Sequence, residues 1–483
     1  MRIAFLILAL SISTAGQTAA DLVLLNGNIR TLDKQRPRAE AVAVSKGRIT
    51  AVGTTTKIRK FVGPNTRVLD AKGKLVIPGF NDSHVHFTGI GNQFSHMDLR
   101  GALGGGQIVE KIGFFTRFLP KGRWILGGGL TFADIGRFPT LEQIDAASPN
   151  NPMLLYSPDY RKALVNSAAM AMAGIRSATG LVEGNAVLRI RKNIPSGHER
   201  NWTEIVETAS NYAASLGVTS IQDVHSDDLA AVLHDLAANG RLKTRVYECI
   251  GIGERRRSIA AKLTAASGDA MVRIGCIKGM SDGSAEEIAE LRHGIGESDK
   301  AGLQVMIHAI GKTPIGHTID AFEAVIAENG KRDRRFRIEH GPRMKPADFE
   351  RLAKSGIVAS MQPHLFDRGG SSFGDNYRGF IAAGVAVAFG SDASMTDLNP
   401  LYGIYAAVDS GPNSITVEEA VRAYTYGSAY AEFQEREKGT IEAGKLADFV
   451  ILSEDIFVID RSEISGTGVV MTIVGGSVVF ETK

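Results

Sequence analysis

The pattern of hydrophobic positions differs between the two ends of the chain and its middle. Near the N-terminus, short apolar runs are separated by turns that contain Gly or Asn, which is typical of β-hairpins. These runs cover residues 22–25, 41–44, 49–52, 68–70 and 75–77, and similar runs recur at 449–452, 469–474 and 477–480. Neither end has enough strands for a sandwich of its own. We therefore predict one composite β-sandwich domain built from residues 21–77 and 436–483.

The middle of the chain alternates between apolar, β-branched segments and stretches with helical periodicity. Eight such segments lie at 78–86, 217–224, 244–252, 272–280, 303–310, 336–341, 357–363 and 385–392. Near-continuous apolar strands separated by helices indicate parallel β–α–β units, and eight units predict a closed (β/α)8 TIM-type barrel over residues 78–435. An open doubly wound sheet is the alternative. It would need fewer units or a phosphate-binding glycine loop, and the Gly-rich stretch 101–105 lacks that pattern.

Residues from about 88 to 200 interrupt this alternation between the first and second barrel segments. Two stretches in this region, 124–129 and 152–156, have the composition of strands and predict an inserted subdomain. Because an insertion after a barrel strand emerges at the catalytic face, we expect it to help shape the substrate pocket.

The first 20 residues have the three-part layout of a secretory signal peptide. Arg2 supplies a positive charge, residues 3–12 are almost wholly apolar, and 13–20 are small and polar, with cleavage expected after Ala20. The apolar run is much shorter than the roughly 20 residues that span a bilayer, so no membrane anchor is expected after cleavage. The sequence predicts an exported protein, either periplasmic or secreted.

Composition narrows the class of protein. Lys and Arg total 55 and Asp and Glu 52, which gives a net charge of only +3 and no broad electrostatic footprint for nucleic acid. Charged residues at 22% and 54 glycines fit a globular enzyme better than a disordered or fibrous chain. The two cysteines, Cys249 and Cys276, form neither a thiolate metal pair nor a disulfide framework by spacing. We therefore expect a fold that is stabilised by its hydrophobic core without disulfides. The sequence does not decide whether the protein forms a homo-oligomer.

Candidate chemistry is concentrated at the C-terminal ends of the predicted barrel strands. His84 and His86 end the first strand, and a strand period of two places both imidazoles on one face. A single His-x-His pair also occurs as a structural pair, so it is only suggestive alone. Further donors fall at the ends of the fourth, fifth, sixth and eighth strands, at Lys278, His308, His340 and Asp392. Because these ends converge in a barrel, the sequence predicts one shared site.

The donor types indicate the kind of site. Imidazoles and carboxylates without thiolates suit one or two divalent ions, most simply Zn²⁺, with an open coordination position. Such an ion lowers the pKa of a bound water towards about 7 and polarises a carbonyl. We assign His84, His86 and Asp392 to the more buried metal and His308 and His340 to a second. Asp392 would also pass the proton of the attacking water to the leaving group, unless its role is only that of a helix N-cap.

Lys278 has two interpretations. An ammonium beside two cations is repelled, so an unmodified lysine argues against a two-metal site. Carboxylated on its amine, Lys278 would be an anionic bridging ligand; unmodified, it would bind an anionic substrate beside a single metal. We favour carboxylation, because like charges in a poorly solvated site are costly.

Several motifs resemble those of one known family. They are Pro78-Gly79-Phe80-Asn81-Asp82-Ser83-His84-Val85-His86, Lys278 with Asp282-Gly283-Ser284, His308-Ala309-Ile310-Gly311, Arg337-Ile338-Glu339-His340, Gly390-Ser391-Asp392 and Gly444-Lys445-Leu446-Ala447-Asp448-Phe449. In order and spacing the chain resembles the metal-dependent amidohydrolase superfamily, and most closely its N-substituted-formamide-deformylase-like branch, amidohydrolase family 3. The resemblance covers nearly all of the chain after residue 20. It implies a barrel with a composite β-sandwich, one or two divalent metals, a carboxylated lysine, and hydrolysis of a C–N bond in an amide, N-formyl, N-acyl or cyclic amide.

The departures from that family concern substrate recognition. Arg161 stands where the branch commonly has a histidine, and Lys312 stands where it often has an aspartate. The connection from Ser284 to the fifth strand is short, which should open the site or leave it incomplete. Arg161 would bind a substrate carboxylate or be a surface residue. His225 and His364, just past the second and seventh strands, are further substrate-binding candidates or structural histidines.

The sequence thus predicts a metal-dependent hydrolase acting on a small amide-type molecule, with metal-activated hydroxide as the nucleophile. A degenerate barrel that binds a small molecule or metal without turnover is the alternative, motivated by the short connection after Ser284. Hydrolysis of an ester or phosphoester stays open as well, because the same nucleophile attacks either centre.

Overall fold

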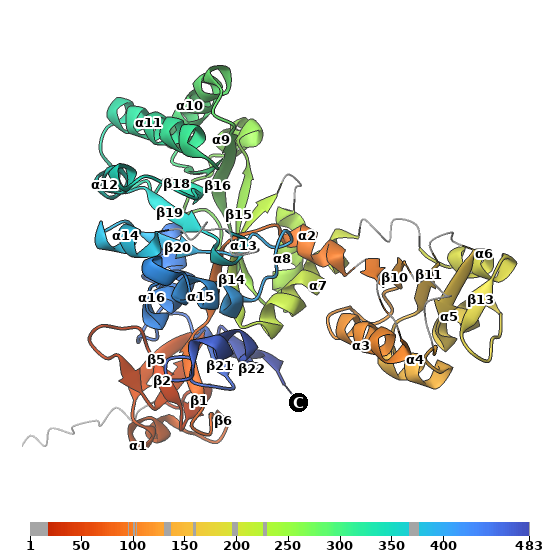
Figure 1. Cartoon of the computed structure of the whole chain (residues 1–483). Coiled ribbons are helices and arrows are strands. Elements are labelled where there is room, and N and C mark those ends of the chain that lie inside the picture. The colour runs from red at the N-terminus through yellow and green to blue at the C-terminus, as the bar shows by residue number, and fades with distance from the viewer. Residues whose placement is uncertain are drawn as a thin grey trace, which may run out of the picture.

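The computed structural model describes residues 18–482 except 95, 100–101, 103, 130–136, 158–160, 196–200, 226–228 and 367–375. Most of the expected signal peptide, residues 1–17, lies outside the described part of the chain. Figure 1 shows a central barrel with a β domain on one side and an inserted domain on another. No helix among the described residues combines the length and the hydropathy needed to cross a bilayer.

The barrel sheet contains eight strands within the described residues, and every neighbouring pair is parallel. They are β8 (Phe80–Val85), β14 (Val218–His225), β15 (Arg245–Gly251), β16 (Val272–Ser281), β17 (Gln304–Ala309), β18 (Arg337–His340), β19 (Val358–Met361) and β20 (Val387–Phe389). Each strand lies inside a segment predicted from the apolar pattern or extends at most one residue past its end. The predicted α/β barrel is confirmed.

Helices cover the outside of the barrel between successive strands (Figure 1). They include α7 (Trp202–Ser215), α8 (Ala230–Ala238), α9 (Arg255–Ala260), α10 (Ala285–Lys300), α11 (Lys312–Asn329), α12 (Pro346–Ser355), α14 (Tyr377–Ala382) and α15 (Pro400–Val408). The connection after Ser284 still contains a crossover helix, α10. The Ser284 side chain caps this helix by accepting a hydrogen bond from the Glu287 backbone nitrogen at 3.3 Å. The short connection therefore shortens the loop at the barrel mouth and leaves the β–α–β unit complete.

A β domain is assembled from both ends of the chain, as the composite sandwich prediction requires. In the described residues one sheet has four strands, β1 (Leu22–Leu25), β4 (Ala41–Ser45), β5 (Arg48–Gly53) and β6 (Arg67–Asp70). The other has six, β2 (Asn28–Arg30), β3 (Arg38–Ala39), β7 (Leu75–Pro78), β21 (Phe449–Leu452), β22 (Val469–Val474) and β23 (Ser477–Glu481). Strand β7 pairs with β21, so the second sheet joins the two termini. Buried apolar residues such as Leu24, Val42, Phe449 and Ile473 form the shared core.

The inserted domain carries its own sheet. Its five strands in the described residues are β9 (His96–Asp98), β10 (Ile125–Gly128), β11 (Met153–Tyr156), β12 (Lys162–Val165) and β13 (Leu181–Glu183). Helices α3 (Gly105–Thr116), α4 (Leu141–Ala147), α5 (Ser167–Ala173) and α6 (Asn185–Arg191) flank this sheet. The domain begins after α2 (Phe87–Gln93), which packs against α7, and Figure 1 shows it projecting from that side of the barrel.

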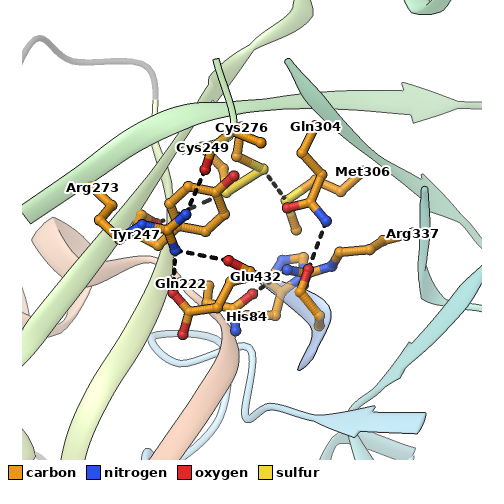
Figure 2. Close-up of a disulfide and its surroundings, with 12 residues drawn as sticks. His84, Gln222, Tyr247, Cys249, Arg273, Cys276, Gln304, Met306, Arg337 and Glu432 are labelled. Atoms are coloured by element: carbon orange, nitrogen blue, oxygen red, sulfur yellow. Dashed lines mark hydrogen bonds and ion pairs between the residues drawn. A yellow bond between two sulfur atoms is a disulfide. The ribbon is translucent and has the colours of Figure 1, made fainter. Parts of the chain in front are cut away.

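The two cysteines are bonded to each other, which corrects the expectation of a fold without disulfides. Cys249 and Cys276 are register partners on β15 and β16, and they form a disulfide whose two residues are fully buried (Figure 2). The sequence separation of 27 residues does not by itself predict this pairing. A parallel β–α–β unit brings residues of that separation side by side, since the crossover helix takes up the intervening chain.

Candidate metal centre

The predicted ligands at the two ends of the barrel sheet lie together. One donor atom from each of His84, His86 and Asp392 falls within 4.8 Å of the other two. The Nε2 nitrogens of His84 and His86 are 3.5 Å and 3.3 Å from Asp392 Oδ1. These residues come from the end of β8 and from the loop after β20, which the barrel brings into contact.

The remaining predicted ligands join the same cluster. The ring centroid of His340 lies 4.9 Å from that of His84 and 4.5 Å from that of His308. Lys278 lies near enough for its charge to lower the pKa of both His84 and His308, although burial is the larger cause in each case. The structure therefore brings the four histidines and Asp392 to one place at the C-terminal ends of the barrel strands, and Lys278 lies close enough on β16 for its charge to act on two of them.

Two of these residues adopt left-handed backbone conformations. His340 has φ +69° and Asp392 has φ +60°, values uncommon for residues other than glycine. Such conformations persist where the surrounding structure enforces them, and they concentrate at functional sites. Asp392 is not a helix cap, because the N-cap of the following helix α15 is Asn399.

Burial sets the protonation of the cluster. It lowers the pKa of His84 well below its ordinary value and that of His340 to about 3. Burial opposes ionisation of Asp392, yet the hydrogen bond with His86 and the nearby imidazoles hold the pKa of Asp392 below its ordinary value. Neutral imidazole and ionised carboxylate are the forms that bind a metal ion.

The donor atoms fit a divalent metal. The Nδ1 nitrogens of His84 and His86 are taken by Glu339 at 2.6 Å and by the Val224 carbonyl at 2.9 Å. Among the described residues, the buried Nε2 of His84 has no hydrogen-bond partner. A buried polar atom without a partner is costly, and ligation by a metal would satisfy it. Neutral imidazoles with one carboxylate are the donor set that zinc and similar ions take.

Two further residues of the sequence motifs, Glu339 and Asp82, contact the cluster. Glu339 contacts His84, and Asp82 accepts hydrogen bonds from the backbone nitrogens of His84 and Ser391 at 3.0 Å each. Strand alternation would place Glu339 on the face opposite His340. The positive φ of His340 ends that alternation, so both side chains reach the barrel interior.

The predicted substrate-binding residues lie in different surroundings. Lys312 is exposed at the first residue of α11, and the exposed Arg161 precedes β12 in the inserted domain. His364, in α13 (Pro363–Phe366), has its ring 5.3 Å from that of Tyr402. His225 ends β14, and its side chain lies outside the described part of the structure. Their roles in substrate binding stay predictions.

Comparison with known proteins decides the family. A model of the amidohydrolase family matches residues 67–480. The chain belongs to the amidohydrolase family. Protein LONG AFTER FAR-RED 3 of Arabidopsis thaliana is 31% identical, with 97% of this chain and 93% of that protein aligned. N-substituted formamide deformylase of Arthrobacter pascens is 27% identical over 95% of this chain and 98% of its own length.

A solved structure supports the same conclusion. The crystal structure of an uncharacterized metal-dependent hydrolase from Pyrococcus furiosus matches with a TM-score of 0.64 and 25% identity, covering 90% of this chain and 99% of that one. The resemblance inferred from the sequence motifs is thereby confirmed, and this amidohydrolase is a metal-dependent hydrolase.

Proposed function

We propose that this amidohydrolase cleaves a C–N bond in a small amide-type molecule, with Asp392 transferring the proton. The observation that carries the proposal is the placement of the Asp392 carboxylate, whose Oδ1 lies 3.3 Å and 3.5 Å from two imidazole nitrogens at the barrel mouth. The name of the formamide deformylase, a relative aligned over nearly its whole length, supports the bond type.

Asp392 supplies the acid–base chemistry. Its lowered pKa keeps the carboxylate ionised at neutral pH, so it can accept a proton from the attacking water and deliver it to the leaving nitrogen. A divalent ion, for which we propose Zn²⁺, would supply a polarised carbonyl and a water of lowered pKa. His84 and His86 would hold that ion with Asp392, and His308 and His340 would hold a second.

Lys278 is proposed to be carboxylated. Burial lowers the pKa of Lys278, although Glu339 and Asp392 partly oppose that shift. A lower pKa increases the fraction of neutral amine, which is the form that can react with CO₂. The resulting carbamate would replace a cation with an anion between the imidazoles, and this removes the charge conflict with two metals.

The mouth of the barrel supports a substrate with an apolar substituent. Met280 is the next inward-facing position after Lys278 and is paired in register with His308, and Ile310 is the equivalent position after His308. Met280 is 65% exposed and Ile310 is 43% exposed; Met395, beyond Asp392, is 69% exposed. Exposed apolar side chains beside a site commonly contact a ligand. We propose that they contact an uncharged part of the substrate.

The cellular location remains a proposal. We propose that the protein is exported after cleavage at Ala20, since the charge and hydropathy pattern of residues 1–20 is that of a signal peptide. N-terminal sequencing of the protein from the extracellular or periplasmic fraction tests this. A chain that begins at Met1 in the cytoplasmic fraction would contradict it.

The activity is tested with the purified, zinc-loaded protein against N-formyl amines, N-acyl amines and cyclic amides, scored by the new amine group that hydrolysis generates. Asp392→Asn should lower kcat by about 10² to 10⁴, the range of general acid–base catalysis. The matched control is Asp397→Asn, an aspartate on the same loop that contacts Tyr212 and should leave kcat nearly unchanged. Turnover of esters or phosphoesters alone would contradict the bond type, and bound metal without any turnover would favour a binding protein.

A further inference from the structure

A buried ion pair lies behind His84, on the side away from Asp392. One oxygen of Glu339 is 2.6 Å from His84 Nδ1, and its other oxygen accepts a 2.8 Å hydrogen bond from Nε of Arg337. None of the three side chains is more than 1% exposed. A buried carboxylate and guanidinium are costly to desolvate, so their retention needs a reason beyond packing.

Arg337 is fixed by groups from three other strands. Its Nη2 nitrogen donates to the Ser83 carbonyl at 2.5 Å and to Ser360 Oγ at 3.1 Å, and its Nη1 nitrogen donates to Gln222 Oε1. Figure 2 shows Arg337 reaching into the barrel interior towards His84 and Gln222. These contacts join β18 to β8, β14 and β19. Glu339 therefore rests against a guanidinium whose position the barrel itself determines.

The two histidines of the His-x-His pair differ in how they are oriented. His86 Nδ1 contacts a neutral backbone carbonyl, that of Val224, at 2.9 Å. His84 Nδ1 contacts a carboxylate at a shorter distance, and its Nε2 is the buried nitrogen without a hydrogen-bond partner among the described residues. A carboxylate on Nδ1 selects the tautomer that leaves Nε2 free to ligate, and it makes the imidazole a stronger donor.

We propose that Glu339 is a positioning residue that sets the tautomer and orientation of His84, and that Arg337 holds Glu339 in place. This inference rests on the proposed metal-dependent function. It assigns to the sixth strand a second contribution to the site, one position before the ligand His340. It also gives a role to Arg337, whose guanidinium links Glu339 to three neighbouring strands of the barrel.

The test measures metal affinity directly, by competition with a chelator, in Glu339→Gln and in the wild-type protein. Loss of such a partner typically weakens metal affinity 10- to 100-fold, and that decrease is expected here. The visible absorption of the Co²⁺-loaded variant should also shift, because the orientation of one ligand changes. The matched control is Glu432→Gln, a carboxylate in the barrel interior that is 1% exposed and paired with Arg273 and Lys438. Its metal affinity should equal that of the wild type.

The outcomes separate this inference from the proposed function. A wild-type protein that binds no divalent metal would overturn the proposed function and the role of Glu339 together. Wild-type binding with equal affinity in Glu339→Gln would overturn only the role of Glu339. Should that variant fail to fold, nitrogen-15 NMR of the metal-loaded wild type decides: a protonated Nδ1 on His84 is expected, and a metal-bound Nδ1 would overturn the inference.

Discussion

The backbone nitrogen of Asp392 donates a 2.8 Å hydrogen bond to the carbonyl oxygen of His84. This bond, with a bridge between Val85 and Ala393, closes the barrel between its first and last strands. Both oxygens of Asp82 also accept hydrogen bonds from the Ser391 nitrogen. The spacing of the two ligands from opposite ends of the sheet is therefore set by backbone bonds, and the site depends on that junction.

Gly390 is expected to be essential to this junction. A Cβ atom at this position would lie 2.6 Å from the His84 nitrogen and 2.7 Å from Asp82 Oδ1, closer than real contacts allow. Gly390→Ala should push β8 away from the loop that follows β20. Because this separates His84 from Asp392, the metal content after dialysis and the melting temperature should both fall. The control is Gly106→Ala in helix α3, where a Cβ atom meets nothing within 4 Å and alanine favours the helix. A fully metallated Gly390→Ala protein would contradict the account.

The apolar barrel mouth predicts a change in specificity for Met280→Glu. Placing a charge against an apolar substituent should lower kcat/KM for such substrates about 10-fold or more, since burying a Met side chain contributes roughly 1.5–3 kcal/mol. Steady-state kinetics on amides with increasingly apolar substituents would measure this. Met172→Glu, on the exposed surface of α5 at 52% exposure, is the control and should have no effect. Equal losses for apolar and polar substrates would argue against the proposed contact.

The ion pair between Asp448 and Arg245 predicts a pH dependence of stability. The pair joins the β domain to β15 through two hydrogen bonds of 2.8 Å. Burial opposes ionisation of Asp448, but the charge and hydrogen bonds of Arg245, together with a backbone hydrogen bond from Gly475 and the charge of Lys438, hold the pKa of Asp448 below its ordinary value of 3.8. Its stabilising contribution is thus present above about pH 4 and is lost as the pH falls through the lowered pKa.

Urea unfolding of Asp448→Asn at several pH values tests this sign. Breaking a buried pair costs about 3–5 kcal/mol, so the variant should be less stable than the wild type by that amount at pH 7 and by progressively less below pH 4. Asp409→Asn removes an exposed pair with Arg461 and should change the free energy of unfolding by no more than about 1 kcal/mol. A pH-independent difference for Asp448→Asn would refute the assignment.

The buried disulfide predicts how the two cysteines react. Because Cys249 and Cys276 are bonded to each other, a thiol reagent should detect no free thiol in the native protein or after unfolding in urea without reductant. Replacing both by alanine should lower the free energy of unfolding by about 3 kcal/mol, a typical disulfide contribution. Two thiols titrated in unreduced, unfolded protein would show that the cysteines are free.

Sequence reasoning located the barrel well because buried parallel strands are apolar on both faces and stand out from the helices between them. It also placed the donors, since strand ends in a barrel converge on one face. It missed the disulfide, because parallel register is not visible in the separation of two cysteines. It gave Glu339 no role. Strand alternation allows only one of two neighbouring residues to face the barrel interior, and the positive φ of His340 that lets both do so is visible only in the structure.

The central claim is that the imidazoles and the carboxylate at the barrel mouth hold a metal ion. Metal analysis by mass spectrometry of the purified wild type, His84→Ala and the exposed control His293→Ala tests it most directly. We predict one or two divalent ions per chain in the wild type and the control, and a loss of bound metal in His84→Ala. A metal-free wild-type protein, or a metal content in His84→Ala equal to that of the wild type, would contradict the claim.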